Sequence, residues 1–250
     1  MKYIVLLLLV FIQVNAEDTK QKVTVGLGPY FQTQPYKDAA TVLVPSPVIF
    51  FDNSLFYVRW SRAGMYFLGD KQEDYAWGFS LTAQPRPYGY KESDSEYLRG
   101  MDARENTLEG GLAFSASYKD AYLEIMALTD LLDRYDSWLV KTEIGDEYRL
   151  GDFSFYPSLI LIYQSDKFVD YYYGIKESEV ATSIYTDAYA PKGGWQVGAQ
   201  TYIKYPVTQN WSAFVNIRAD KITDDAANSP LVDQDYIYSG LVSLIYTFEY

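Results

Sequence analysis

The residues of this sequence that could do chemistry are carboxylates, hydroxyls and amines. The 250-residue chain contains no histidine and no cysteine. It therefore cannot build a Ser-His-Asp triad, a Cys-His pair, a histidine-based zinc site or a disulfide. Paired carboxylates could still cleave a glycosidic bond if their separation were fixed. The acidic residues gathered in polar segments are Glu92, Asp94, Glu96, Asp102, Glu105, Asp224 and Asp225.

These acidic residues lie in segments of loop composition, where charged runs are usually solvated. Their spacing does not match an EF-hand, and nothing in it fixes the separation that a glycosidase needs. We therefore expect no catalytic residue, no cofactor and no metal site, and the chain is predicted not to be an enzyme. The net charge of −12 also argues against nucleic acid as a partner.

The N-terminus has the pattern of a secretory signal peptide. One positive charge at Lys2 precedes an apolar stretch from Tyr3 to Ile12, which is too short to cross a bilayer as a helix. The chain then turns polar and reaches Ala16, followed by the charged Glu17. We predict a signal peptide at 1–16, cleaved between Ala16 and Glu17, and one domain at 17–250. An N-terminal anchor or a buried strand is the alternative.

Composition favours a β-barrel over the other exported classes. After Ile12 the sequence has no apolar run of the length that a membrane-spanning helix needs. Aromatic residues make up 18% of the chain, with 26 tyrosines, and amphipathic rings are enriched at membrane interfaces. A soluble β-sandwich remains the alternative, because its strands also alternate.

Period-2 alternation recurs along the chain and is clearest in the last strand. One face of that strand has aromatics at both ends and aliphatics between them, as expected of a lipid-facing strand. The residues of this face are Tyr238, Gly240, Val242, Leu244, Tyr246, Phe248 and Tyr250. The pattern predicts an all-β protein, an antiparallel transmembrane β-barrel of about twelve strands.

The predicted strands lie near 22–31, 47–51, 55–60, 63–68, 75–84, 107–118, 121–131, 137–146, 153–164, 194–205, 211–221 and 237–250. Long connections at 32–46, 85–106, 165–193 and 222–236 all fall at one end, as extracellular loops would. The segment 47–68 could instead form a single hairpin, which would give ten strands. Pro157 inside a predicted strand is a second irregularity, because proline removes a donor from the ladder.

The C-terminus and the inward faces carry further predictions. Tyr246, Phe248 and the final Tyr250 resemble the signal read by the barrel-insertion machinery, although Ile245 stands where that signal typically has glycine. Charged residues are predicted to face the lumen at Glu109, Glu124, Lys141, Glu143, Lys204, Arg218 and Asp220. A barrel of this size could be a narrow channel or a plugged one, and the sequence leaves both open.

Several motifs, taken together, resemble the MipA/OmpV family of outer-membrane proteins. They are Gly26-Leu27-Gly28-Pro29-Tyr30, Pro45-Ser46-Pro47, Phe50-Phe51-Asp52, Asp170-Tyr171-Tyr172-Tyr173-Gly174, and the segment from Asp225 through Asn228, Ser229 and Pro230 to Val232. Their order spans nearly all of the predicted mature chain.

The resemblance implies a barrel in the bacterial outer membrane, surrounded by lipid and lipopolysaccharide. It further implies a scaffold that brings a lytic transglycosylase near a penicillin-binding murein synthase, or an adhesion surface. A narrow pore for small solutes is the alternative function.

Overall fold

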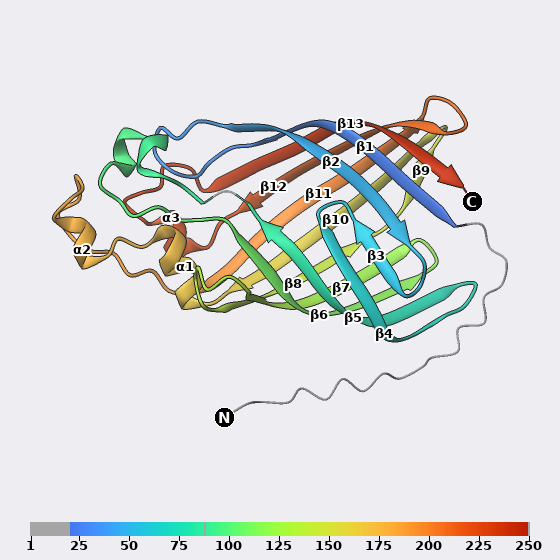
Figure 1. Cartoon of the computed structure of the whole chain (residues 1–250), viewed down its shortest axis with the longest axis horizontal. Coiled ribbons are helices and arrows are strands. Elements are labelled where there is room, and N and C mark those ends of the chain that lie inside the picture. The colour runs from blue at the N-terminus through green and yellow to red at the C-terminus, as the bar shows by residue number, and fades with distance from the viewer. Residues whose placement is uncertain (1–20, 88, 250) are drawn as a thin grey trace.

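The protein, described by a computed structural model over residues 21–87 and 89–249, is a closed antiparallel β-barrel with a cap of loops and short helices at one end (Figure 1). The strands are β1 Lys22–Gln32, β2 Val42–Asp52, β3 Phe56–Arg59, β4 Arg62–Lys71, β5 Tyr75–Arg86, β6 Thr107–Tyr118, β7 Ala121–Asp130, β8 Trp138–Gly145, β9 Tyr148–Leu150, β10 Phe153–Gln164, β11 Gly194–Pro206, β12 Trp211–Lys221 and β13 Tyr236–Glu249. The α-helices are α1 Asp166–Tyr173, α2 Glu177–Val180 and α3 Asp224–Ala227, and the 3-10 helices are η1 Glu92–Asp94 and η2 Glu96–Leu98.

The barrel closes between the first and last strands. β1 pairs with β13 from Lys22↔Glu249 to Gln32↔Ser239, so the sheet has no free end at this seam. The described residues form thirteen strands, but β8 and β9 follow one another along the same neighbour, β10. Counted as one position in the wall, they give the twelve-stranded barrel that the alternation predicts, which confirms the fold class.

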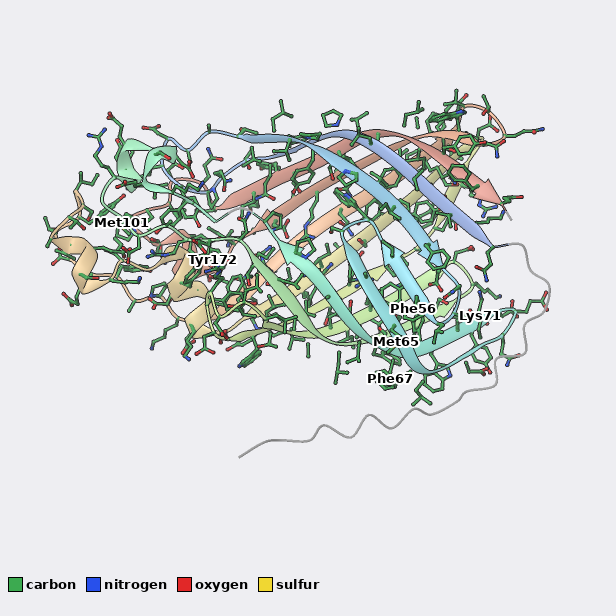
Figure 2. All side chains as sticks on the ribbon, viewed as in Figure 1. Phe56, Met65, Phe67, Lys71, Met101 and Tyr172 are labelled. Atoms are coloured by element: carbon green, nitrogen blue, oxygen red, sulfur yellow. The ribbon has the colours of Figure 1, made fainter. Side chains whose placement is uncertain are left out.

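Alternating side chains explain why these segments form a barrel wall. On β13, Val242 and Leu244 are 58% and 50% exposed, whereas Leu241 and Ile245 on either side of this pair are almost fully buried. Phe56 and Phe67 likewise project from the outer surface of the β3–β4 hairpin (Figure 2). A wall with apolar side chains outside is the arrangement that lipid favours.

Two stretches of the wall differ from the sequence expectation. β2 begins at Val42, so the connection before it is 33–41 rather than 32–46; β2, β3 and β4 are three separate strands, as predicted, and the alternative of a single hairpin is wrong. The connection between the strands predicted at 137–146 and 153–164 contains the short strand β9. The break between β8 and β9 lies opposite Pro157, whose carbonyl accepts from the Asp146 N–H at 3.2 Å. On that edge proline has no N–H to donate, and the ladder is interrupted between β8 and β9.

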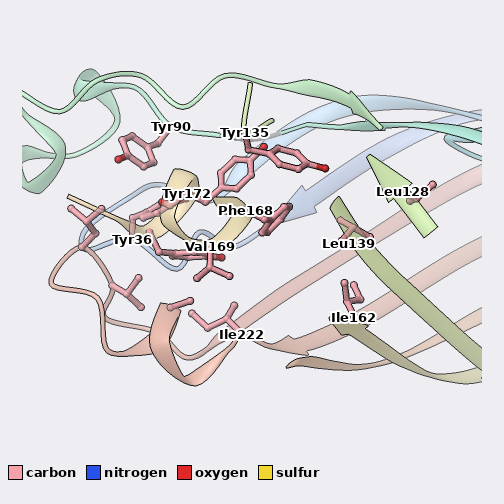
Figure 3. Close-up of a cluster of buried hydrophobic side chains, with 14 of the residues drawn as sticks. Tyr36, Tyr90, Leu128, Tyr135, Leu139, Ile162, Phe168, Val169, Tyr172 and Ile222 are labelled. Atoms are coloured by element: carbon pink, nitrogen blue, oxygen red, sulfur yellow. The ribbon is translucent and has the colours of Figure 1, made fainter. Parts of the chain in front are cut away.

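The long connections fold together into the cap, with a shared hydrophobic core (Figure 3). Tyr36, Tyr90, Phe168 and Tyr172 come from three different connections and are all buried there. Within the part of the chain that the structure covers, no helix has the length and apolarity needed to cross a bilayer. The cap is therefore a small folded unit seated on the long-loop end of the barrel.

Candidate functional site

The middle of the lumen is filled by ion pairs between strands. Glu124 on β7 accepts from Arg62 Nη2 at 2.7 Å and from Arg59 Nη1 at 3.1 Å, which joins it to the β3–β4 hairpin. The side chains of Arg62 and Glu124 are nearly buried. A buried pair of this kind needs further hydrogen bonds to offset desolvation. Ser115 supplies one through its hydroxyl, 3.2 Å from Glu124.

A second group of charges includes Glu143 on β8, which is the cross-strand neighbour of Glu124 on β7, and a pair on β12. Glu143 on β8 receives Lys141 Nζ at 3.0 Å, the Ser158 hydroxyl at 3.1 Å and the Gln200 amide at 2.7 Å. Arg218 pairs with Asp220 at 2.6 Å on β12. Five of the positions predicted to face the lumen, Glu124, Lys141, Glu143, Arg218 and Asp220, are thus paired inside the barrel.

Three arginines that bind inward-facing acids were not predicted from the sequence. Arg59 was on a predicted strand but was not expected to enter the lumen, Arg62 fell between two predicted strands, and Arg86 lay in the predicted connection 85–106. Extending the alternation of β4 back to residue 62, and that of β5 forward to residue 86, would have placed both arginines on inward rows.

The lumen is continuous with the cap through Arg86 and Glu109. Arg86 pairs with Glu109, which also accepts from Gln84 at 2.8 Å and from the Tyr135 hydroxyl at 3.0 Å. The Arg86 guanidinium lies 4.8 Å from the centre of the Phe168 ring on α1. A cation over an aromatic face adds attraction to the burial of the ring. Helix α1 is therefore held directly above the charged lumen.

A buried ion pair joins two of the long connections in the cap. Arg104 binds Glu179 on α2 with two contacts, Nη1 to Oε1 at 2.9 Å and Nη2 to Oε2 at 3.1 Å, and both side chains are almost fully buried. Burial opposes ionisation of Glu179, but hydrogen bonds from Arg104 and the Lys176 backbone outweigh it and hold the pKa of its carboxyl below the usual value.

The tyrosine-rich and Asn-Ser-Pro motifs of the family resemblance meet in this cap. Tyr171, Tyr172 and Tyr173 end helix α1 and Gly174 follows, while Asn228, Ser229 and Pro230 follow α3. The Ser229 hydroxyl donates to the Tyr173 carbonyl at 2.6 Å, and the Tyr36 hydroxyl donates to the Tyr172 carbonyl at 3.2 Å. These residues contribute to locking the long connections against one another.

The short-turn end of the barrel is hollow instead. A polar cavity of about 400 Å³ opens there between the ends of β1, β10, β11 and β13. Its charged lining residues are Lys22, Glu147, Arg149, Asp152, Lys204 and Glu249. Lys22 pairs with Glu249 and Arg149 with Glu147, each at 2.8 Å. Within the described ranges, Lys204 and Asp152 form no ion pair, so their charges face the cavity.

The acids of the long connections do not converge on one site. Glu105 pairs with Arg134 at 2.6 Å and Asp102 with Lys176 at 2.8 Å, and Asp225 accepts from the Lys192 backbone N–H. No group of acids able to hold a metal ion is found among the described residues. Each acid has a local structural contact of the kind expected of a loop.

The structure describes only some of the residues predicted for signal cleavage and for the C-terminal insertion signal. Ala16, Glu17 and Tyr250 lie outside the described residues, so signal cleavage and the final aromatic stay predictions. Tyr246 and Phe248 lie on β13 at the short-turn end, with ring centres 4.6 Å apart, and Trp211 packs edge-on against Tyr246. This aromatic cluster stands where a membrane interface is expected.

Comparison of the sequence with known proteins identifies the family of this chain. The family described as "MltA-interacting protein MipA" matches residues 25–248. The chain belongs to this MipA family. A relative from Escherichia coli K12, named MltA-interacting protein, is 26% identical and is aligned over 100% of this chain and 99% of its own. The outer membrane protein OmpV of Vibrio cholerae is 24% identical over 58% of this chain and 55% of its own length.

Together with the barrel, these names place the MipA-family chain in the outer membrane. Among solved structures, OmpT, an outer membrane protein of Vibrio cholerae, is similar with a TM-score of 0.40 and 9% identity, over 95% of this chain and 100% of that one. In outer-membrane barrels the long loops are extracellular and the short turns periplasmic, so we expect the same orientation of the two ends here.

Proposed function

We propose that this protein is a scaffold that holds murein-remodelling enzymes at the periplasmic face of the outer membrane. The proposal extends to this chain what the name of its MltA-interacting relative says of that protein. The observation that carries it is the difference between the two ends of the barrel. The extracellular end is occupied by the hydrophobic core of the cap, while the polar cavity opens on the periplasmic side.

The contents of the barrel favour a scaffold over a pore. The mid-lumen acids Glu124 and Glu143 are already bound by arginine, lysine and amide groups, so little capacity is left to coordinate a passing solute. Above them, Phe168 of the cap rests on Arg86. A rigid, filled barrel with a charged periplasmic rim suits a docking platform, because rim charges steer and orient a partner.

The test is retention of murein enzymes by the purified protein. Immobilised in detergent, it should retain a lytic transglycosylase of the MltA class and, through it, a penicillin-binding murein synthase. Lys204→Glu, which reverses a charge in the periplasmic cavity, should weaken retention several-fold. Lys192→Glu, an exposed charge at the extracellular end, should not. Equal retention by the two variants, or none by the wild type, would refute a periplasmic docking role.

A conductance recording addresses the pore. In planar bilayers the protein should give no discrete openings, since its lumen and its extracellular end are occupied. Regular conductance steps that respond to Glu143→Ala would instead establish a channel.

A further inference from the structure

The barrel wall lacks strand pairing on one side of its extracellular half. β3 has only four residues and turns back at Trp60-Ser61 into β4 (Figure 1). β2 pairs with β3 only from Phe50 to Asp52, and Trp60 adds one bond, its N–H donating to the Ile49 carbonyl at 2.8 Å. Across the hairpin, β4 pairs with β5 only up to Ala63↔Ala83.

In the described chain, no strand lies between residues 42–48 of β2 and residues 84–86 of β5. We call this opening the β2–β5 window. A backbone edge left bare toward lipid is unfavourable, because each unsatisfied N–H or C=O costs several kcal/mol. The residues along the window reduce the number of unsatisfied backbone groups that face lipid.

The β2 edge has proline where its donors would point into the window. In a strand, the N–H and C=O of one residue face the same neighbour, and the facing alternates along the chain. The Ile49 carbonyl faces the hairpin, so the backbone groups of Leu43, Pro45 and Pro47 face the same edge. Proline has no N–H. Pro45 and Pro47 therefore remove two donors from this edge.

The β5 edge also has a proline at a position whose N–H would point into the window. Pro85 pairs with Leu108 of β6, and the Leu108 carbonyl faces β7, where it accepts from the Leu131 N–H at 2.8 Å. The pair Pro85↔Leu108 is thus one whose backbone groups point away from each other. The missing N–H of Pro85 consequently faces the window. An edge that has lost donors pairs less well with another strand, so prolines on both edges disfavour closing of the window by strand addition.

The window is apolar on its outer side. Leu43, on the strand that borders it, is 70% exposed, and Leu27, one strand further on β1, is 63% exposed. They rim a shallow groove of about 380 Å³ on the outer surface of β1 and β2, whose floor includes Gly28, Pro29 and Pro45. This groove is continuous with the lipid-facing surface of the barrel.

On its inner side the window is covered by Trp60. The indole Nε1 donates to the Ser46 hydroxyl at 3.1 Å, and the ring packs edge-on against Tyr30 with centres 5.8 Å apart. Beside it, Val48 is fully buried. The φ of Trp60 is +56°, a conformation that a bulky residue rarely adopts and that surrounding structure must hold in place. The turn thus holds an aromatic ring directly behind the window.

We propose that the β2–β5 window is a lipid-binding site, in which an acyl chain from the outer leaflet enters the wall and lies against Trp60. Three observations select this occupant. The window lies in the extracellular half of the wall, its outer lining is apolar and continuous with the lipid face, and its proline edges disfavour a peptide strand. The site is independent of the periplasmic docking role, and neither depends on the other.

The test is quenching of Trp60 fluorescence by brominated lipid. The chain has five tryptophans, and replacing Trp77, Trp138, Trp195 and Trp211 by phenylalanine leaves Trp60 as the sole reporter. In vesicles of dibrominated phosphatidylcholine its emission should fall by at least half of the loss shown by a variant that keeps only Trp195, which is 59% exposed on the outer surface.

The matched control is Tyr57→Trp in a tryptophan-free chain. Tyr57 lies on the same hairpin and faces inward, but it is 1% exposed and sits behind the paired wall at Gly64. Its emission should change little. If Trp60 is quenched no more than this control, the acyl chain does not enter and the proposal is wrong.

A second measurement does not require the variant with four replaced tryptophans to fold. Because the chain has no cysteine, Ser46→Cys can carry a fluorescent label attached before refolding, with all tryptophans kept. Ser80→Cys, on β5 opposite Tyr66 of β4 and fully buried, is its control. Strong quenching at Ser46 and weak quenching at Ser80 supports the site, whereas equal quenching overturns it.

Discussion

The buried pair of Arg104 and Glu179 should be a main determinant of cap stability. Glu179→Gln keeps the size of the side chain and removes its charge. Arg104, 1% exposed at its side chain, would then be a buried cation without a counter-charge. Removing one partner of a buried pair typically costs about 3–5 kcal/mol. Arg104 would keep its bonds to the backbone carbonyls of Tyr171, Asp102 and Gly174, so we expect the lower end, about 3 kcal/mol.

A neighbouring pair provides the control. Asp102 and Lys176 join the same two connections at 2.8 Å, but their side chains are 62% and 54% exposed. Exposed pairs contribute about 0–1 kcal/mol, because water and salt screen them. Asp102→Asn should therefore leave the cap nearly as stable as in the wild type.

Native-state proteolysis measures the difference. The barrel wall resists protease, so cleavage within 87–106 and 165–193 reports opening of the cap. Since about 1.4 kcal/mol corresponds to a tenfold change in an equilibrium, Glu179→Gln should raise the open fraction on the order of 100-fold. Asp102→Asn should raise it less than about tenfold. Equal cleavage rates in the two variants would mean that burial of the pair does not govern the cap.

Leu244→Arg on the lipid face should reduce assembly by about 2–4 kcal/mol, whereas Ser154→Arg in the periplasmic cavity should be tolerated; equal yields of heat-modifiable barrel would contradict the assignment of faces. Because the pKa of Glu179 lies below its ordinary 4.5, its stabilisation is present above that pH and is lost as pH falls through the lowered value. Cap proteolysis should therefore rise on acidification below pH 4.5 in the wild type and much less in Glu179→Gln. Deleting Tyr250 should lower the protease-resistant protein in the outer membrane without affecting export, which fractionation of the envelope would measure. Intact-mass measurement should find a mature chain beginning at Glu17.

The lipid-facing rows could be predicted because they depend on local geometry. In a strand, side chains alternate between faces whatever the partner strand is. The order of Val242 and Leu244 between aromatic residues therefore identified the outer face of β13 before any pairing was known. The same rule placed Glu124, Glu143 and Asp220 inside the barrel.

The partners of those inward charges could not be read in the same way. Glu124 is bound by Arg62, more than sixty residues earlier, and Arg104 reaches Glu179, 75 residues away. In the sequence Arg62 falls in a turn, and Arg104 and Glu179 fall in polar connections, where charged groups are usually solvated. Only folding of the long connections over the barrel removes the water and makes the pairing strong.

The β2–β5 window separates most clearly what the sequence determines from what only the tertiary structure decides. The sequence by itself determined that Pro45, Pro47 and Pro85 cannot donate hydrogen bonds, but it placed Pro45 and Pro85 in connections rather than in strands. It did not determine toward which neighbour those missing donors point, because that depends on register across strands distant in the chain. Closure of the barrel set the register at Ile49↔Val25 and Pro85↔Leu108. Side-chain direction follows from the local backbone, whereas the neighbour that each backbone group faces is set only when the whole sheet is assembled.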